Sequence, residues 1–106
     1  MIQCMCIVQQ GQKPNQQRDE LSQLLNSFAE DSFGAKAEID WIVVSAGNGF
    51  TAAKPSTSSI VAFTAPDPVE QGQRVALLTQ LCDRWMTATG CSLNEIVVAI
   101  NDPPPA

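Results

Sequence analysis

Hydrophobic and polar positions follow the same order twice along this chain. Each half opens with a short apolar run typical of a strand, residues 1–8 and 59–65. Apolar residues at helical spacing come next, and a second strand-like run closes each half, at about 39–45 and 95–101. The helical stripes consist of Leu21, Leu24, Leu25 and Phe28 in the first half and Leu77, Leu78, Leu81, Cys82 and Trp85 in the second. The pattern predicts strand, helix, strand in each half.

The two halves also match residue by residue. A shift of 56 residues superposes Gln17 on Gln73, Arg18 on Arg74, Leu21 on Leu77, Leu25 on Leu81 and Gly34 on Gly90. The two glycines stand where a helix commonly ends in the left-handed conformation. A repeat of this length predicts two tandem βαβ units in one chain.

Proline and glycine mark the predicted boundaries. Pro14 suits the first turn of a helix, and Pro66 and Pro68 separate the second opening strand from its helix. Prolines 103–105 prevent further strand pairing after residue 101. We therefore expect one domain over 1–106, with pseudo-repeats at about 1–45 and 57–101 joined by a loop at 46–56.

Crossover handedness predicts the layers of the fold. Two right-handed βαβ units related by a two-fold axis place both helices on the same face of a four-stranded sheet, which is an α+β architecture. The opposite sheet face is then bare, although the predicted strands are apolar on both sides. An apolar face of that size is not stable in water. We therefore predict burial against sister chains in a homotrimer.

Composition excludes several classes of function. The chain has 6 basic and 11 acidic residues, a net charge of −5, and no basic cluster, so we expect no nucleic-acid partner. No apolar run approaches the length of a membrane span, and the N-terminus lacks the features of a signal peptide, so a cytoplasmic location is expected. With four cysteines, no C-x-x-C pair and no histidine, we expect no metal site and no cofactor.

Helix and strand motifs in both halves resemble the tautomerase superfamily. The second half carries the E-Q-x-x-R signature at residues 70–74, a glycine helix stop at Gly90, and the closing strand I-V-V-x-I-x-D at 96–102. The first half repeats the signature around Arg18 and the closing strand at 41–44. The resemblance covers nearly the whole chain. It implies the long form of the superfamily, similar to cis-3-chloroacrylic acid dehalogenase and macrophage migration inhibitory factor, with three sheets packed into a barrel.

The resemblance also implies chemistry at an N-terminal proline, which this chain lacks. The sequence begins Met1-Ile2-Gln3, and no proline precedes Pro14. Because isoleucine hinders removal of the initiator methionine, we expect Met1 to remain and its primary amine to be a weak candidate base. The arginines that family enzymes use to hold a substrate carboxylate are absent from the expected places.

The candidate substrate-binding residues follow from the same resemblance. Phe50 matches a phenylalanine that forms a pocket wall in 4-oxalocrotonate tautomerase, and Lys54 is a cation for a small carboxylate near Met1. Three further candidates are Ile2 beside Met1, Trp41 on the closing strand, and Arg74 at the start of the second helix.

These observations leave three hypotheses open. The first is a tautomerase-type protein with weak or altered activity on a small keto or enol acid. The second is a noncatalytic oligomeric ligand-binding protein. The third is a ferredoxin-like dimeric α/β barrel, which differs by antiparallel pairing of the strands and by forming dimers.

Overall fold

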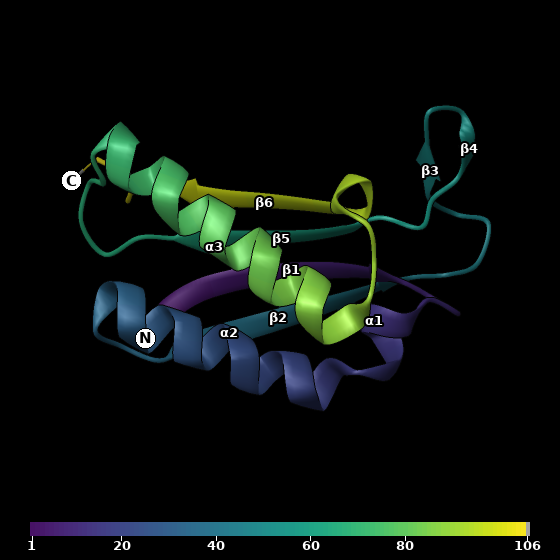
Figure 1. Ribbon diagram of the computed structural model, residues 1–106, viewed down its shortest axis with the longest axis horizontal. Helices are drawn as coiled ribbons and strands as arrows, with labels where there is room; N and C mark the ends of the chain where they lie inside the picture. The colour runs from purple at the N-terminus through teal and green to yellow at the C-terminus, as the bar shows by residue number, and fades with distance from the viewer. Residues whose placement is uncertain (106) are drawn as a thin grey trace.

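The computed structural model describes residues 1–105, which form a four-stranded sheet covered by two long helices (Figure 1). A small two-stranded hairpin projects from one end of this body. The elements are β1 (Ile2–Gln9), α1 (Lys13–Gln16), α2 (Arg18–Phe33), β2 (Ala37–Val44), β3 (Phe50–Thr51), β4 (Lys54–Pro55), β5 (Ser59–Thr64), α3 (Gln71–Thr89), the 3-10 turn η1 (Leu93–Glu95) and β6 (Ile96–Asn101).

The strand pairing confirms the predicted topology. The strand order is β2-β1-β5-β6, with β1 parallel to β2 and β5 parallel to β6. The two halves meet through the antiparallel pair β1 and β5. Parallel pairing within each half excludes the ferredoxin-like alternative.

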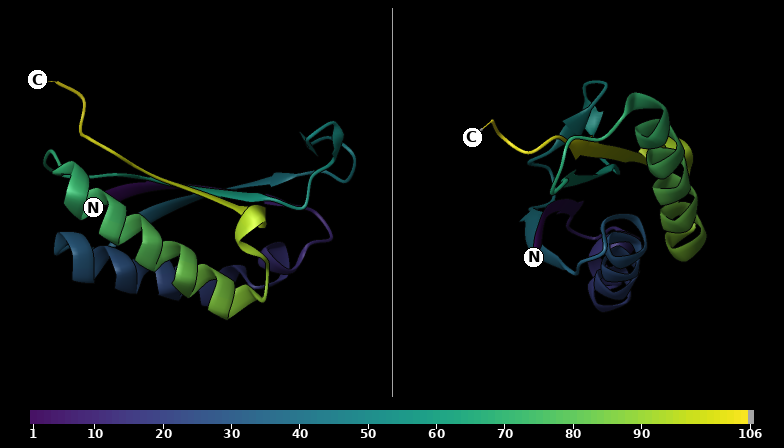
Figure 2. Two further views of the ribbon diagram at one scale, coloured as in Figure 1. Left: turned by 45° about the horizontal axis from the view of Figure 1, so that its top comes forward. Right: turned by 90° about the vertical axis from the view of Figure 1, so that its left-hand side faces the viewer.

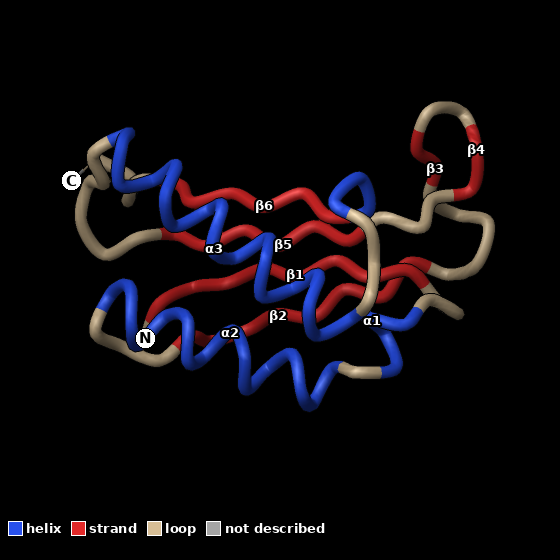
Figure 3. The backbone as a smooth tube through the Cα atoms, viewed as in Figure 1, coloured by secondary structure: helices blue, strands red, loops and turns tan. Residues whose placement is uncertain are grey.

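Both long helices lie on one face of the sheet, as predicted (Figures 1 and 2). Alternate positions of β1 and β5 point toward the helices and are buried there. Trp85 and Phe28 are the largest fully buried side chains, and Phe28 packs against Phe63 with ring centroids 5.5 Å apart. The tube in Figure 3 shows both long helices in front of the sheet, and the right-hand view of Figure 2 shows no helix of residues 1–105 on the opposite face.

The predicted helix between Pro14 and Gly34 is divided in two. Gln17 leaves helical geometry at φ −109° and ψ 23°, which separates the short α1 from α2. Pro14 lies in the first turn of α1, as expected. Gly34 and Gly90 end α2 and α3 in the left-handed conformation, at φ 74° and 73°. The predicted helix stops are therefore confirmed.

The four cysteines are unpaired, and the two in β1 are buried. Burial, followed by the nearby charge of Asp40, raises the pKa of the Cys4 thiol to about 12. Burial likewise raises the pKa of Cys6 far above its usual range. A thiol that stays protonated is a poor nucleophile and metal ligand, so these side chains serve as small hydrophobic groups. Among the described residues, no three histidine, cysteine or acidic side chains gather as a metal-binding group.

The uncovered sheet face has an apolar end and a polar end. The strand register places four branched side chains side by side across the whole sheet, and we call them the aliphatic row. Their neighbours on the same face become polar toward the start of β1, where a second line of side chains forms the polar row. The aliphatic row is Ile42, Ile7, Ile60 and Val97, and the polar row is Glu38, Gln3, Thr64 and Asn101.

The aliphatic row is exposed to solvent in the isolated chain. Ile42 is 45% exposed, Ile60 37% and Val97 54%, and Met5 beside them is 41% exposed. Side chains of this size are usually buried, and several together on one flat face mark an interaction surface. Among the described residues, no helix is long and apolar enough to cross a membrane.

The β3–β4 hairpin turns through two alanines in an unfavourable conformation. Ala52 and Ala53 have φ of 51° and 61°, whereas two-residue hairpin turns of this kind favour Asn and Gly. The left-handed conformation costs a residue with a Cβ atom roughly 1–2 kcal/mol. The hairpin therefore folds against a local backbone preference.

We expect Ala53→Gly to raise the free energy of unfolding by about 1 kcal/mol, because glycine adopts positive φ without that cost. Ala46→Gly is the matched control, since Ala46 lies in the preceding loop without positive φ. Thermal unfolding of the two variants checks this prediction. A lower melting temperature for both variants would show that the turn is not strained.

Candidate functional site

Met1 directly precedes β1 and is exposed to solvent. Its side chain is 79% exposed, whereas Ile2 is only 5% exposed and faces the helices. The backbone N–H of Ile2 donates to the carbonyl of Lys36 at 2.9 Å. Ile2 is therefore part of the core, and the prediction that its side chain binds substrate does not fit this orientation.

Lys36 is the cation that the fold brings beside Met1, and sequence reasoning missed it. The parallel pair β1–β2 aligns Ile2 with Ala37, so that Lys36 stands beside Met1 one position earlier. Side chains alternate along a strand, which places Lys36, like Glu38, on the uncovered face. The parallel pairing of the two strands could have predicted this neighbour, because the first residues of two parallel strands lie at the same end of the sheet.

Arg74, predicted to bind substrate, is engaged in contacts within the chain. One Nη atom donates to the Asp102 carboxylate at 2.5 Å and to the Val69 carbonyl at 2.9 Å. The other donates to the Gln71 side chain at 3.0 Å. The Val69 backbone N–H donates to the same carboxylate and, with Arg74, holds the pKa of Asp102 below its usual range. Arg74 thus fixes the chain end after β6 to the start of α3.

Phe50 is the first residue of β3, which Figure 1 shows at the opposite end of the sheet from the N-terminus. Phe50 lines a groove there. The groove is a hollow of about 310 Å³ whose floor is formed by Ile7, Val44, Ile60 and Val97. Hydroxyl and amide side chains surround that floor, and none of the lining residues is charged. Phe50 itself is 63% exposed.

Met1 and Phe50 therefore do not share a pocket within one chain. β1 spans Ile2–Gln9, and at about 3.3 Å per residue it separates the two by roughly 20 Å. Phe50 instead lies beside the start of β5, the strand that corresponds to β1 in the second half. No free chain amine exists at that position.

Lys54 is exposed on the hairpin and does not line the groove. It pairs with Thr51 across the β3–β4 turn, while Phe50 pairs with Pro55. Thr51 itself lines the groove, so Lys54 lies next to the groove although it is not among the residues that line it.

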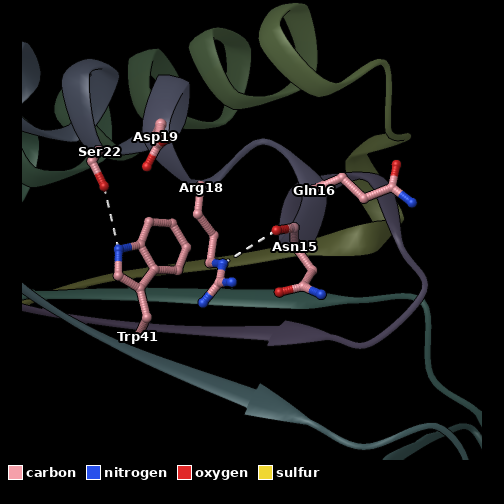
Figure 4. Close-up of a pocket in the computed structure, with 6 residues that line it drawn as sticks. All are labelled: Asn15, Gln16, Arg18, Asp19, Ser22 and Trp41. Carbon is pink, nitrogen blue, oxygen red and sulfur yellow. Dashed lines mark hydrogen bonds between the residues drawn. The ribbon is translucent and has the colours of Figure 1, made fainter.

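Trp41, the remaining predicted site residue, lines a second hollow, on the helix side of the sheet (Figure 4). Its indole N–H donates to the Ser22 hydroxyl at 3.3 Å. Asn15 and Arg18 complete the side toward α1. This hollow is separate from both the Met1 amine and the Phe50 groove.

The comparisons with known proteins rest on structure alone. No protein-family profile matches the sequence, and no curated protein matches it significantly. The crystal structure of native Ps01740 superposes with a TM-score of 0.83 at 27% identity, covering 96% of this chain and 94% of that one. Pt0534 inactivated by 2-oxo-3-pentynoate gives 0.81 at 18% identity, covering 96% and 85%.

Three other groups of solved structures identify the fold. A fused 4-OT described as a symmetric trimer gives a TM-score of 0.80 at 17% identity, covering 96% of this chain and 85% of that one. A member of the cis-3-chloroacrylic acid dehalogenase family gives 0.76, and a macrophage migration inhibitory factor-like protein from Entamoeba histolytica gives 0.73. The chain has the fold of the tautomerase superfamily. The resemblance drawn from the sequence motifs is confirmed at this level.

The tautomerase fold makes the end of the sheet at Met1 the candidate site. The resemblance places the family's proton-transferring proline at the first residue of the chain, and here that position, just before β1, holds Met1. The strand register places Lys36 and the polar row next to it. Within the described residues, this is the end of the sheet where Met1, a cation, the Glu38 carboxylate and neutral hydrogen-bonding side chains come together.

Proposed function

We propose that the protein is a tautomerase-superfamily protein with weak or altered activity on a small keto or enol acid. In this proposal, the Met1 amine moves a proton between the enol oxygen and the carbon next to the carbonyl, and is left unchanged at the end. The observation that carries the proposal is the position of Met1, which is exposed and directly precedes β1 in a tautomerase fold. A primary amine of an acyclic residue replaces the proline ring, so we expect slow proton transfer.

Lys36 replaces the missing arginines in this proposal. The β1–β2 register places Lys36 next to Met1, and in this proposal its ammonium attracts the substrate carboxylate. An ammonium binds a carboxylate as a point charge and without the bidentate geometry of a guanidinium. We therefore expect weak binding and broad tolerance among small acids.

We further propose that three chains assemble through their uncovered sheet faces. The aliphatic row supplies the apolar contact, and the fused 4-OT neighbours described as trimers offer a precedent for the arrangement. The polar row places the hydrated end of each face beside Met1. The four unpaired cysteines support our proposal of a cytoplasmic location.

Ketonisation of the enol of phenylpyruvate, or of 2-hydroxymuconate, by the purified protein tests the proposed activity. We expect turnover far below the usual enzyme range of about 1 to 1,000 per second. Turnover within that range would show that an efficient base other than Met1 is present. No residue described above would account for such a base.

Labelling with 2-oxo-3-pentynoate tests the role of the amine independently of turnover. That reagent inactivates Pt0534, whose fold this chain shares. We expect the Met1 nitrogen to add across the triple bond, which increases the intact mass by one whole reagent because nothing leaves. Lys36→Ala should slow the labelling, whereas Lys13→Ala should not. Labelling on cysteine alone would contradict the proposal.

The alternative is a noncatalytic oligomeric ligand-binding protein. It is favoured by the contacts of Arg74, whose Nη atoms donate to Asp102, Val69 and Gln71 and are therefore not available to a substrate. The two hypotheses differ in the labelling experiment, since a merely binding protein has no need of a reactive Met1 amine.

A further inference from the structure

A polar hollow of about 380 Å³ opens on the helix side of the sheet, where α1 and α2 meet the edge strand β2 (Figure 4). It is distinct from the site proposed at Met1, because Trp41 belongs to the set of β2 positions that face the helices. Charged, amide, hydroxyl and aromatic groups converge on it. Its lining residues are Asn15, Gln16, Arg18, Asp19, Ser22 and Trp41.

The side chain of Arg18 lines this hollow, and its guanidinium forms no ion pair among the described residues. Its Nε donates to the Asn15 carbonyl at 3.2 Å, and within residues 1–105 this is its one hydrogen bond. The other two arginines differ, because Arg74 pairs with Asp102 and Arg84 with Asp31. The free Nη edge of a guanidinium matches the two oxygens of a carboxylate.

Asn15 contributes an acceptor that lacks a donor. Its side-chain Oδ1 is buried and has no hydrogen-bond partner. Leaving a buried acceptor unpaired carries a free-energy cost. Because Asn15 as a whole is only half-buried and lines the hollow, a rotation of its side chain brings this acceptor to a ligand donor and removes that cost. In Figure 4 the Asn15 amide lies on the same side of the hollow as the Arg18 guanidinium.

Trp41 supplies the apolar side of the hollow. Its indole N–H is already bound to Ser22, so the ring offers surface area rather than a donor. The side chain is only partly buried and packs its inner side on the core. In Figure 4 the ring and the Arg18 guanidinium stand next to each other, one from β2 and one from α2. Planar organic groups pack favourably against such a ring.

We propose that this hollow binds a small carboxylate that carries an aromatic ring and a hydrogen-bond donor on the carbon next to the carboxylate. The carboxylate binds the Nη edge of Arg18, the donor binds Asn15 Oδ1, and the ring packs on Trp41. Aromatic 2-hydroxy acids and aromatic 2-amino acids share this chemistry. Asp19, a lining carboxylate without an ion pair among the described residues, favours the ammonium of the amino acid.

Titration followed by NMR tests the proposal, because the chain has two tryptophans with separate indole N–H signals. The probes are phenylalanine, phenyllactate and 3-phenylpropionate, which differ only in an ammonium, a hydroxyl or no donor. We expect the Trp41 signal to shift with phenylalanine and phenyllactate, and less with 3-phenylpropionate. The fully buried Trp85 signal should stay in place and serves as the internal reference. Stronger binding of phenylalanine than of phenyllactate identifies the amino acid as the ligand class, and the reverse identifies the hydroxy acid.

Two variants make the assignment specific to these residues. Arg18→Gln should raise the Kd of phenyllactate at least about tenfold, since it removes a charge-assisted contact. The matched control Arg84→Gln removes the same charge from α3 and should leave the Kd unchanged. Asn15→Leu should abolish the advantage of phenyllactate over 3-phenylpropionate. Equal shifts at both tryptophans, identical affinities for all three probes, or an unaltered Kd in Arg18→Gln would each overturn the proposal.

Discussion

A chain that begins with proline in place of Met1 is expected to catalyse ketonisation of the enol of phenylpyruvate at least about 100-fold faster than the unmodified protein. General base catalysis typically contributes about 100- to 10,000-fold, and the resemblance implies a proline amine as the base at this position. The variant is Met1→Pro, expressed behind an initiator methionine that is removed. Ile2 must be kept, because its side chain is buried in the core.

Met1→Ala, processed in the same way, is the control for this experiment. It keeps a primary amine and shortens the side chain, so any gain that comes only from a smaller first residue will appear in both variants. Steady-state ketonisation rates of the unmodified protein and of the two variants show whether the gain requires the proline amine. Equal rates in the proline and alanine variants would show that the site has lost more than its base.

A charge in the aliphatic row is expected to break the assembly. In Val97→Lys an ammonium stands on the uncovered sheet face, and covering that face would bury one unpaired charge per chain at a cost of several kcal/mol each. The isolated chain tolerates the same side chain in solvent, because Val97 is 54% exposed. We therefore expect the mass in solution to fall from three chains to one without unfolding.

Val75→Lys is a closely matched control for Val97→Lys. Val75 has the same side chain and 55% exposure, but it lies on α3 at the opposite side of the sheet. It should leave the mass unchanged. Light scattering and circular dichroism of both variants separate dissociation from unfolding. A trimer that survives Val97→Lys would place the contact surface elsewhere.

The sequence predicted the secondary structure and topology because these depend on local patterns. Apolar spacing located the helices, and the left-handed glycines Gly34 and Gly90 located their ends. Crossover handedness then placed both helices on one face. The break at Gln17 escaped prediction, since the polar residues around it fit one continuous helix as well as two.

The arrangement of the site was predicted less well, although the direction of the strands determines which residues of one chain lie near Met1. Parallel strands start at one edge of the sheet and end at the other. The hairpin follows the end of β2, so Phe50 had to lie far from Met1, and the start of β2 had to bring Lys36 close to it. The motif resemblance placed Phe50 near the N-terminus, because motifs alone do not show at which end of the sheet each loop lies.

Arg74 illustrates a different limit of the sequence. Its place in the repeat suggested an available cation, yet its partner Asp102 lies 28 residues away and approaches only after β6 pairs with β5. Arg18, the corresponding residue in the first half, has no carboxylate within ion-pair distance in residues 1–105. Repeat symmetry therefore predicted the positions of these side chains but not their partners.

The mass of the unmodified protein in solution tests the proposed trimer directly, because the aliphatic row needs a partner to cover it. Sedimentation equilibrium or light scattering at moderate salt and micromolar concentration is sufficient. We expect a mass near three times 11.4 kDa. A stable monomer of 11.4 kDa would contradict it, because the aliphatic row would then remain uncovered in water.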